Sequence, residues 1–294
     1  MFCNKQCMLR MIIISFLCIG FASCDETFTN TSAHEGKSRR KITYSYACLD
    51  SAVAGNPTSK KIDKASDLVR RIAFHNDDVT DSVQNQWGDA FHQDAVESKA
   101  FVLLNNPNIT ATLQKTQNDL LAVRENPSKI KYSIYALNDT AINAFTFGGH
   151  IYVTKAMFEK CKNNQSLLYA IVGHEIGHSE RGHTKKSIEE MIMANEIFGE
   201  KNGSTAFQIK KMLTSSFNQK NELEADYYGV DLVDQLGDDV CAAVAFWKEM
   251  AKTENAYNKV EDFLRTHPYS ALRAQCLEQH IKTNYNKDCN ASAH

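Results

Sequence analysis

A His-Glu-x-x-His pattern at residues 174–178 constrains this 294-residue chain more than any other feature of its sequence. Two histidines four residues apart lie on one face of a helix, so the imidazoles of His174 and His178 can reach the same metal ion. Apolar residues recur with helical spacing over residues 167–176, which predicts a helix here. Glu175 projects beside the first histidine, where it can take a proton from water that a zinc ion has made acidic. The alternative is a helix whose two histidines are solvated or packed in the core.

A second pair, Glu222 and Asp226, also stands four residues apart and therefore shares a helical face. A histidine that binds a metal usually donates its other ring hydrogen to a carboxylate. If Glu222 is the third ligand and Asp226 orients a histidine, the chain has the two-histidine, one-glutamate ligand set of a catalytic zinc, with a position left for water. A solvated acidic face is the alternative. Glu224 lies on a different face of this predicted helix, so we expect it at the surface.

The composition indicates an α+β fold that is mainly α-helical with a small sheet. The chain has only four prolines and thirteen glycines, and helical patterns recur along it. Apolar residues make up 43% of the chain, which is enough for a real core. Lysine and arginine together number 33 and aspartate and glutamate 35, so there is no basic surplus to suggest a nucleic-acid partner.

The N-terminus is predicted to be a targeting segment that is not part of the fold. Basic residues precede an apolar run at residues 11–22, which is too short to span a bilayer comfortably. Small residues just before Cys24 are typical of a bacterial lipoprotein signal, in which this cysteine is acylated, although Phe21 stands where leucine is usual. An ordinary secretory signal cut near Ala22 and an uncleaved anchor are the alternatives. All three export the protein.

Five cysteines follow the predicted lipidation site, so at least one of them has no partner within the chain. They are Cys48, Cys161, Cys241, Cys276 and Cys289. Cys276 and Cys289 are both near the C-terminus, and we predict a disulfide between them. No Cys-x-x-Cys pair is present, which argues against a zinc site built from cysteines.

The periodicity of apolar residues changes along the chain from helical to strand-like. Helical spacing extends from about residue 60 to 104 and, after a break, to about residue 123. A period of two then predicts strands at residues 130–135, 144–147 and 150–154, with a turn at Gly148 and Gly149. A sheet directly before a metal-binding helix can accept an extended peptide at an edge strand and hold it across the metal. A purely structural hairpin is the alternative.

Taken together, these motifs resemble those of the gluzincin peptidases related to the HtpX heat-shock peptidase. That family includes the CaaX prenyl protease, the mitochondrial Oma-type proteases and the periplasmic LoiP and BepA-type peptidases. The resemblance covers about residues 60–285 and rests on four motifs in the same order. They are Asn143-Ala-Phe with Gly148-Gly149, His174-Glu-x-x-His178, Glu222-x-x-x-Asp226, and Thr266-His267-Pro268 followed by Arg273. LoiP-like members are lipoproteins, which agrees with a signal ending at Cys24.

The resemblance implies a zincin-like domain in which an edge strand of the small sheet flanks the active-site helix. His174, His178 and Glu222 would bind one Zn²⁺. Glu175 would be the general base and then the proton donor to the leaving amine. Asp226 would orient a zinc-bound histidine.

The resemblance also implies roles for residues outside the two main motifs. His267 would aid oxyanion stabilisation or cap the resting zinc, and Arg273 would hold the local structure or the oxyanion side. The substrate backbone would bind to Asn143 and to the strand that contains Gly149, Ile151 and Val153. His183 matches a histidine common in the family. We interpret it as structural, because the third histidine of the extended metzincin pattern would fall at Thr184.

The motifs and the resemblance together predict a zinc-dependent endopeptidase that cleaves exported, unfolded or damaged proteins. The expected layout is a signal peptide at residues 1–23, a lipidated flexible tether at 24–58 and a zinc metallopeptidase domain at 59–294. Protein or peptide substrates are the expected partners, together with a membrane on the periplasmic side, reached through Cys24. A soluble secreted protein is the alternative location. The alternative function is a chaperone-like binding module with a capped, rarely active zinc.

Overall fold

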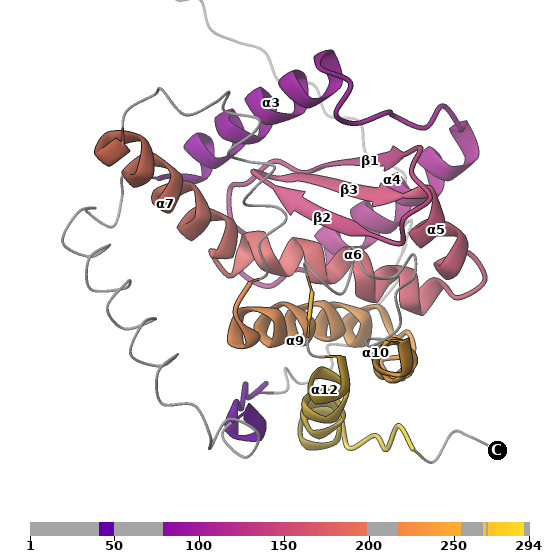
Figure 1. The fold of residues 1–294 in the computed structure, drawn as a ribbon. Helices are drawn as coiled ribbons and strands as arrows, with labels where there is room; N and C mark the ends of the chain where they lie inside the picture. Colours follow the sequence, from indigo (N-terminus) through magenta and orange to yellow (C-terminus); the bar gives the residue numbers. More distant parts are fainter. Residues whose placement is uncertain (1–40, 50–78, 199–216, 254–266, 269, 291–294) are drawn as a thin grey trace, which may run out of the picture. The chain divides into compact units, whose positions relative to one another are not determined.

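The computed structural model describes residues 41–49, 79–198, 217–253, 267–268 and 270–290 (Figure 1). All of them belong to the unit that spans residues 41–294. The predicted signal peptide and Cys24 lie outside the described residues, as does the first part of the predicted helical region, residues 60–78. In the described part of the chain, no helix combines the length and the apolar character that crossing a bilayer requires.

A three-stranded mixed sheet forms where the alternating pattern predicts it. Its strands are β1 (Ser133–Leu137), β2 (Ala144–Phe147) and β3 (His150–Thr154). The order in the sheet is β1-β3-β2, with β1 parallel and β2 antiparallel to β3. β3 is therefore the central strand, and β2 is the edge strand that flanks α6, with no further strand paired to it among the described residues.

The first strand begins later than the alternating pattern predicts. The Asn85 side chain accepts a hydrogen bond from the Lys131 backbone amide at 3.0 Å and donates one to the Lys131 carbonyl at 2.8 Å. These bonds occupy the backbone of Lys131, so the ladder begins at Ser133, which pairs with His150. Gly148 and Gly149 form the tight turn between β2 and β3 with φ of +57° and +88°, values that favour glycine.

Eight helices accompany the sheet in the described residues. They are α3 (Asp81–Glu97), α4 (Pro107–Ala122), α5 (Lys155–Cys161), α6 (Gln165–Glu180), α7 (His183–Phe198), α9 (Gln219–Leu236), α10 (Cys241–Thr253) and α12 (Ser270–Tyr285). The predicted helix running to residue 104 ends earlier, because the chain turns at Ser98 and Lys99 adopts a positive φ of 58°. The mainly helical α+β prediction is confirmed.

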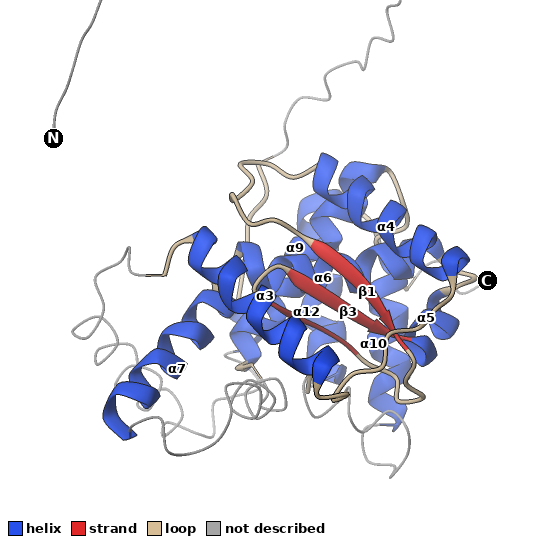
Figure 2. Cartoon of the chain, turned by 90° about the horizontal axis from the view of Figure 1, so that it is seen from above, coloured by secondary structure: helices blue, strands red, loops and turns tan. Residues whose placement is uncertain are grey.

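The sheet separates two apolar clusters, because alternate residues of each strand point to opposite faces. α3 crosses one face, where Phe91 packs against Phe147 and Tyr152 (Figures 1 and 2). α6 lies against the other face beside β2, and α9 and α12 follow it in successive layers (Figure 1). Ile151 and Val153 point into this larger cluster and are fully buried.

Helices α6 and α9 cross in close contact at a pair of glycines. A β-carbon added at Gly173 would lie 3.0 Å from the Gly229 α-carbon, and one added at Gly229 would lie 2.8 Å from the His174 backbone nitrogen. Side chains longer than hydrogen cannot fit here at the observed separation. The crossing therefore places the backbone of His174 directly against α9, the helix that carries Glu222 and Asp226.

Two disulfides attach both ends of the described chain to the helices. Cys48 is bonded to Cys276 and Cys241 to Cys289, while Cys161 is free and buried. The predicted Cys276–Cys289 disulfide is wrong. Cys276 stands nine residues before the end of α12, about 14 Å along its axis, while two bridged α-carbons lie within about 7 Å. At least one unpaired cysteine was expected among the five, and Cys161 is unpaired.

The segment Lys41–Leu49, which we call the strap, packs against α9 and α12. The Thr43 amide donates to the Asn284 side chain at 2.9 Å, and the Tyr44 hydroxyl bonds the Asp231 carboxylate at 2.7 Å. The Tyr227 ring lies against the rings of Tyr44 and Tyr46. This segment falls within residues 24–58, where a flexible tether was predicted, so the folded domain includes residues that the sequence assigned to the tether.

Candidate metal centre

Four buried side chains from three parts of the chain converge on one point. His174 and His178 come from α6, Glu222 from the first turn of α9, and His267 from the residues just before α12. One ligand atom from each lies within 4.8 Å of the other three. His174 Nε2 is 3.0 Å from His178 Nε2 and 3.6 Å from Glu222 Oε2. Two ligands of a tetrahedral zinc ion are about 3.3 Å apart, so these separations fit such an ion.

The protonation of the two α6 histidines supports a cation between them. His174 Nδ1 lies 2.9 Å from Asp226 Oδ1, a carboxylate, so Nδ1 carries the proton and the Nε2 lone pair faces His178. Burial lowers the pKa of His178 well below its usual value, which leaves its imidazole neutral, the form that binds metals. The Glu222 Oε1 atom is buried without a hydrogen bond from the described residues. A metal ion would bind the lone pairs of His174 Nε2, His178 Nε2 and Glu222 Oε1, which face one another.

Asp226 and Arg273 form the support behind the ligands. Arg273 donates to both Asp226 oxygens, at 2.8 and 2.7 Å, and contacts Glu222 Oε2 at 2.8 Å. Burial alone would raise the pKa of Asp226, but the Arg273 guanidinium lowers it to about 2. The guanidinium also stacks over the Trp247 ring at 3.5 Å. Asp226 therefore stays ionised, with its Oδ1 atom against His174 Nδ1.

Glu175 lies beside the cluster. Its side chain is 1% exposed, and its Oε1 atom receives no hydrogen bond from the described residues. The His267 imidazole is nearby, with its Nε2 atom 3.7 Å from that oxygen. Burial raises the pKa of Glu175, which strengthens it as a proton acceptor.

His267 lies within hydrogen-bonding distance of three acceptor atoms. Its Nδ1 lies 3.0 Å from Glu222 Oε2 and 3.3 Å from His174 Nε2, and its Nε2 donates to the Ala144 carbonyl at 3.2 Å. Burial alone would lower the pKa of His267, but the Glu222 carboxylate raises it. The contact with Ala144 ties the metal centre to the edge strand β2, a link that sequence spacing could not reveal.

The order of the strands contradicts the prediction that Gly149, Ile151 and Val153 bind the substrate backbone. Gly149, Ile151 and Val153 belong to the turn before β3 or to β3 itself, a central strand whose two edges are already paired. A β-carbon on Gly149 would lie 2.3 Å from the Lys131 carbonyl, so the missing side chain serves packing there. Asn143 differs, because it precedes the edge strand and its buried Oδ1 atom receives no hydrogen bond from the described part of the chain.

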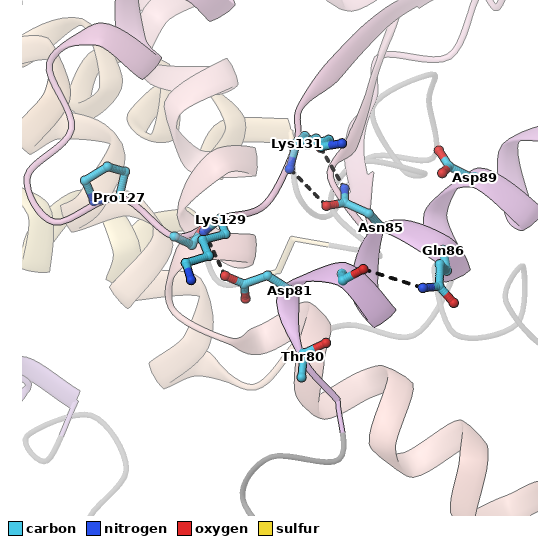
Figure 3. Close-up of a pocket in the computed structure, with 10 residues that line it drawn as sticks. Thr80, Asp81, Asn85, Gln86, Asp89, Pro127, Lys129 and Lys131 are labelled. Carbon is cyan, nitrogen blue, oxygen red and sulfur yellow. Dashed lines mark hydrogen bonds between the residues drawn. The ribbon is translucent and has the colours of Figure 1, made fainter. Parts of the chain in front are cut away.

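A cavity lies away from the metal centre. It has a volume of about 700 Å³ and opens between the N-terminal turns of α3 and residues 127–131 (Figure 3). Asp81 accepts a hydrogen bond from the Lys129 amide across it, and Asn85 bonds the Lys131 backbone. Its lysines and aspartates have mixed charge, and we assign it no role in catalysis.

The buried cluster, with three members on α6 and α9, lies beside a small mixed sheet and can hold a metal ion. The family model of Peptidase family M48 matches residues 107–281, and the chain belongs to this family. All four residues of the cluster and their two supports fall within the matched range. The family membership that the sequence motifs indicated is thereby confirmed.

Curated relatives include proteases of bacteria and mitochondria. Metalloprotease LoiP of Escherichia coli is 28% identical over 205 residues, which cover 66% of this chain and 77% of LoiP. The beta-barrel assembly-enhancing protease of Yersinia pestis is 28% identical over 184 residues, or 56% of this chain and 37% of that protein. The mitochondrial metalloendopeptidase OMA1 of Schizosaccharomyces pombe is 28% identical over 160 residues, 52% of this chain and 47% of OMA1. The chain thus spans less than half the length of the latter two.

Proposed function

We propose that the chain is a zinc-dependent endopeptidase that cleaves exported proteins that are unfolded or damaged. The observation that carries this proposal is the buried convergence of His174, His178 and Glu222 with the Glu175 carboxylate at its side. Two histidines and one glutamate form the ligand set of a catalytic zinc. A zinc ion held by these residues would supply Lewis-acid polarisation of a peptide carbonyl and would make a bound water more acidic.

In this proposal Glu175 moves the protons. Its Oε1 atom accepts a proton from the attacking water and later returns it to the leaving amine. Burial raises the pKa of this carboxyl, which favours its taking up the proton. Asp226 keeps the His174 ring in one tautomer, and Arg273 fixes Asp226.

The free edge of β2 is our proposed site for the substrate backbone. The Thr154 amide donates to the Asn143 carbonyl. Backbone hydrogen-bonding groups of successive strand residues point to opposite sides, so those of Ala144 and Thr146 point away from β3. An extended peptide can pair with these groups as an added strand. The Ala144 carbonyl already accepts from His267, so a peptide at this edge would lie next to the metal centre. Asn143 stands at the start of the same edge.

Export is supported by the disulfides as well as by the N-terminal sequence. Two disulfides within residues 41–294 are typical of an oxidising compartment. We propose that Cys24 is lipidated after removal of residues 1–23 and anchors the protein on the periplasmic side of a membrane. The remaining residues before the strap would form the tether.

One observation favours a second function. His267 contributes a fourth potential ligand atom, and four protein ligands are typical of a closed zinc site. A zinc ion capped in this way would cleave rarely, and the protein would then act mainly as a chaperone-like binding module. Replacement of His267 by Ala separates the two functions, because it should raise cleavage only if His267 caps the metal.

The test of the main proposal uses the Glu175→Gln variant. Purified parent protein should contain one zinc per chain and cleave casein until a chelator is added. The variant should keep its zinc and lose nearly all cleavage, because glutamine cannot accept the proton. Cleavage at the parental rate by Glu175→Gln would refute the role of Glu175, and a parent protein that binds no zinc would refute the proposal as a whole.

A further inference from the structure

The two histidines of the metal motif are held from behind by different groups. His174 Nδ1 contacts a carboxylate directly, at 2.9 Å from Asp226 Oδ1. His178 Nδ1 instead contacts another imidazole, at 3.1 Å from His183 Nδ1. His183 is the first residue of α7 and follows Gly182, whose φ is +75°. This left-handed turn directs the chain back so that His183 lies behind His178.

If His178 binds a metal ion, the positions of the ring protons on His178 and His183 follow. His178 faces the other ligands with Nε2, so Nε2 needs a free lone pair and Nδ1 must carry the proton. That proton points at His183 Nδ1, which can accept it only through a lone pair. The His183 proton is therefore on Nε2. Its nearest charged acceptor is Glu224 Oε2 at 3.5 Å, which is longer than a normal hydrogen bond but still electrostatically favourable.

The surroundings of His183 hold it in this orientation. His183 is 5% exposed, and its partner Glu224 is itself held by Arg181 at 3.1 Å. The Phe217 ring stacks on His178 with centroids 4.1 Å apart and lies 6.0 Å from His183. Glu224 was expected to be a surface residue and His183 to be only structural. Their meeting depends on the turn between α6 and α7, which the spacing of either residue does not show.

We infer that His183 is a positioning residue that accepts the His178 Nδ1 proton and so orients this metal ligand, with Glu224 selecting the His183 tautomer. The inference rests on the proposed function only in that His178 binds a metal. Groups that hold a ligating histidine from behind typically contribute about 10- to 100-fold to metal affinity. A residue that only fills space at the start of α7 would contribute to stability and not to the affinity for zinc.

The experiment compares variants that separate hydrogen bonding from packing. His183→Leu keeps much of the volume and removes the acceptor, whereas His183→Asn keeps a polar atom where Nδ1 lies. Thr184→Val is the matched control, because Thr184 is the next residue, is buried, and its hydroxyl makes no hydrogen bond in the described part of the chain. The zinc affinity of each full-chain variant is measured by competition with a chelator, and its folding by urea denaturation.

We expect His183→Leu to bind zinc about 10-fold more weakly or worse, His183→Asn to recover most of that loss, and Thr184→Val to match the parent. Nitrogen NMR of the zinc-bound parent should show the His183 proton on Nε2. Equal zinc affinity of a folded His183→Leu protein, or a loss that His183→Asn does not recover, would overturn the inference. A proton found on His183 Nδ1 would also overturn it. Because zinc binding is the readout, a parent that binds zinc without cleaving casein would contradict the proposed function alone.

Discussion

Replacing Gly229 by Ala tests whether the metal centre depends on the close crossing of α6 and α9. The added β-carbon would lie 2.8 Å from the His174 nitrogen and 3.0 Å from the Gly173 carbonyl carbon. Ordinary contacts between such atoms are about 3.5–4.0 Å, so the two helices must separate by roughly 0.5–1 Å. The backbone of both helices forms this contact, and no flexible side chain can move aside to relieve it.

The magnitude follows from two opposing effects on stability and one effect on the metal. Overpacking costs about 1–3 kcal/mol, while alanine gains about 1 kcal/mol over glycine inside a helix, so the free energy of unfolding should fall by roughly 0–2 kcal/mol. Metal–ligand distances tolerate only about 0.2 Å. Glu222 lies two turns before Gly229 on α9, and a shift of that helix moves it away from His174 and His178. Zinc affinity should therefore fall at least about tenfold, which corresponds to about 1.4 kcal/mol.

The assay is zinc competition with a chelator, alongside urea denaturation. Gly237→Ala is the matched control, because Gly237 ends α9 with φ of +76°, and a β-carbon added there would meet no atom of the described residues within 4 Å. That control should lose about 1–2 kcal/mol through backbone strain and keep its zinc affinity. A Gly229→Ala protein that is more stable than the parent and binds zinc equally well would refute the reasoning, since helix propensity alone would then explain it.

Three further perturbations have consequences that denaturation can measure. Replacing Cys241 and Cys289 together by serine should lower the free energy of unfolding in urea by about 2–4 kcal/mol, because their disulfide closes a loop across a separation of 48 residues; an unchanged midpoint would contradict this. In chelated protein, the pKa of Asp226 is lowered from 3.8 to about 2. Its ionised carboxylate should therefore add about 2 kcal/mol to the free energy of unfolding above pH 4, and this stabilisation should be lost as the pH falls towards 2. Asp226→Asn should remove this part of the pH dependence of unfolding. Asn164→Ala should cost about 1 kcal/mol, since the Asn164 side chain caps α6 through the Leu167 amide at 3.0 Å, and Asn164→Asp should retain most of the stability.

The residues of the candidate metal centre could be singled out from the sequence because each pair lies within one helix. A spacing of four places His174 above His178 and Glu222 above Asp226 whatever the rest of the fold does. Chemistry then pairs the histidines with the carboxylates, and the structure brings all four together. The same reasoning succeeded for the strand β2 and its turn, since alternation and paired glycines are local signals.

The order of the strands and the disulfide partners could not be predicted in the same way. Alternation identifies a strand but does not tell which neighbours it pairs with, and β3 proved to lie between β1 and β2. Cys48 meets Cys276 only because the strap folds across the chain over a separation of 228 residues. His183 likewise reaches His178 through a turn at a positive φ, which gives no periodic signal.

The disulfide between the strap and α12 has a mechanical consequence. If the chain before Lys41 is anchored to a membrane, tension in that anchor enters the domain at the strap and passes through the covalent bond at Cys48 to Cys276. Cys276 lies one helical turn after Arg273, the residue that forms ion pairs with Asp226 and Glu222. A force on the tether would therefore be delivered close to the support of the metal centre, while the edge strand on the other side of α6 stays outside its path.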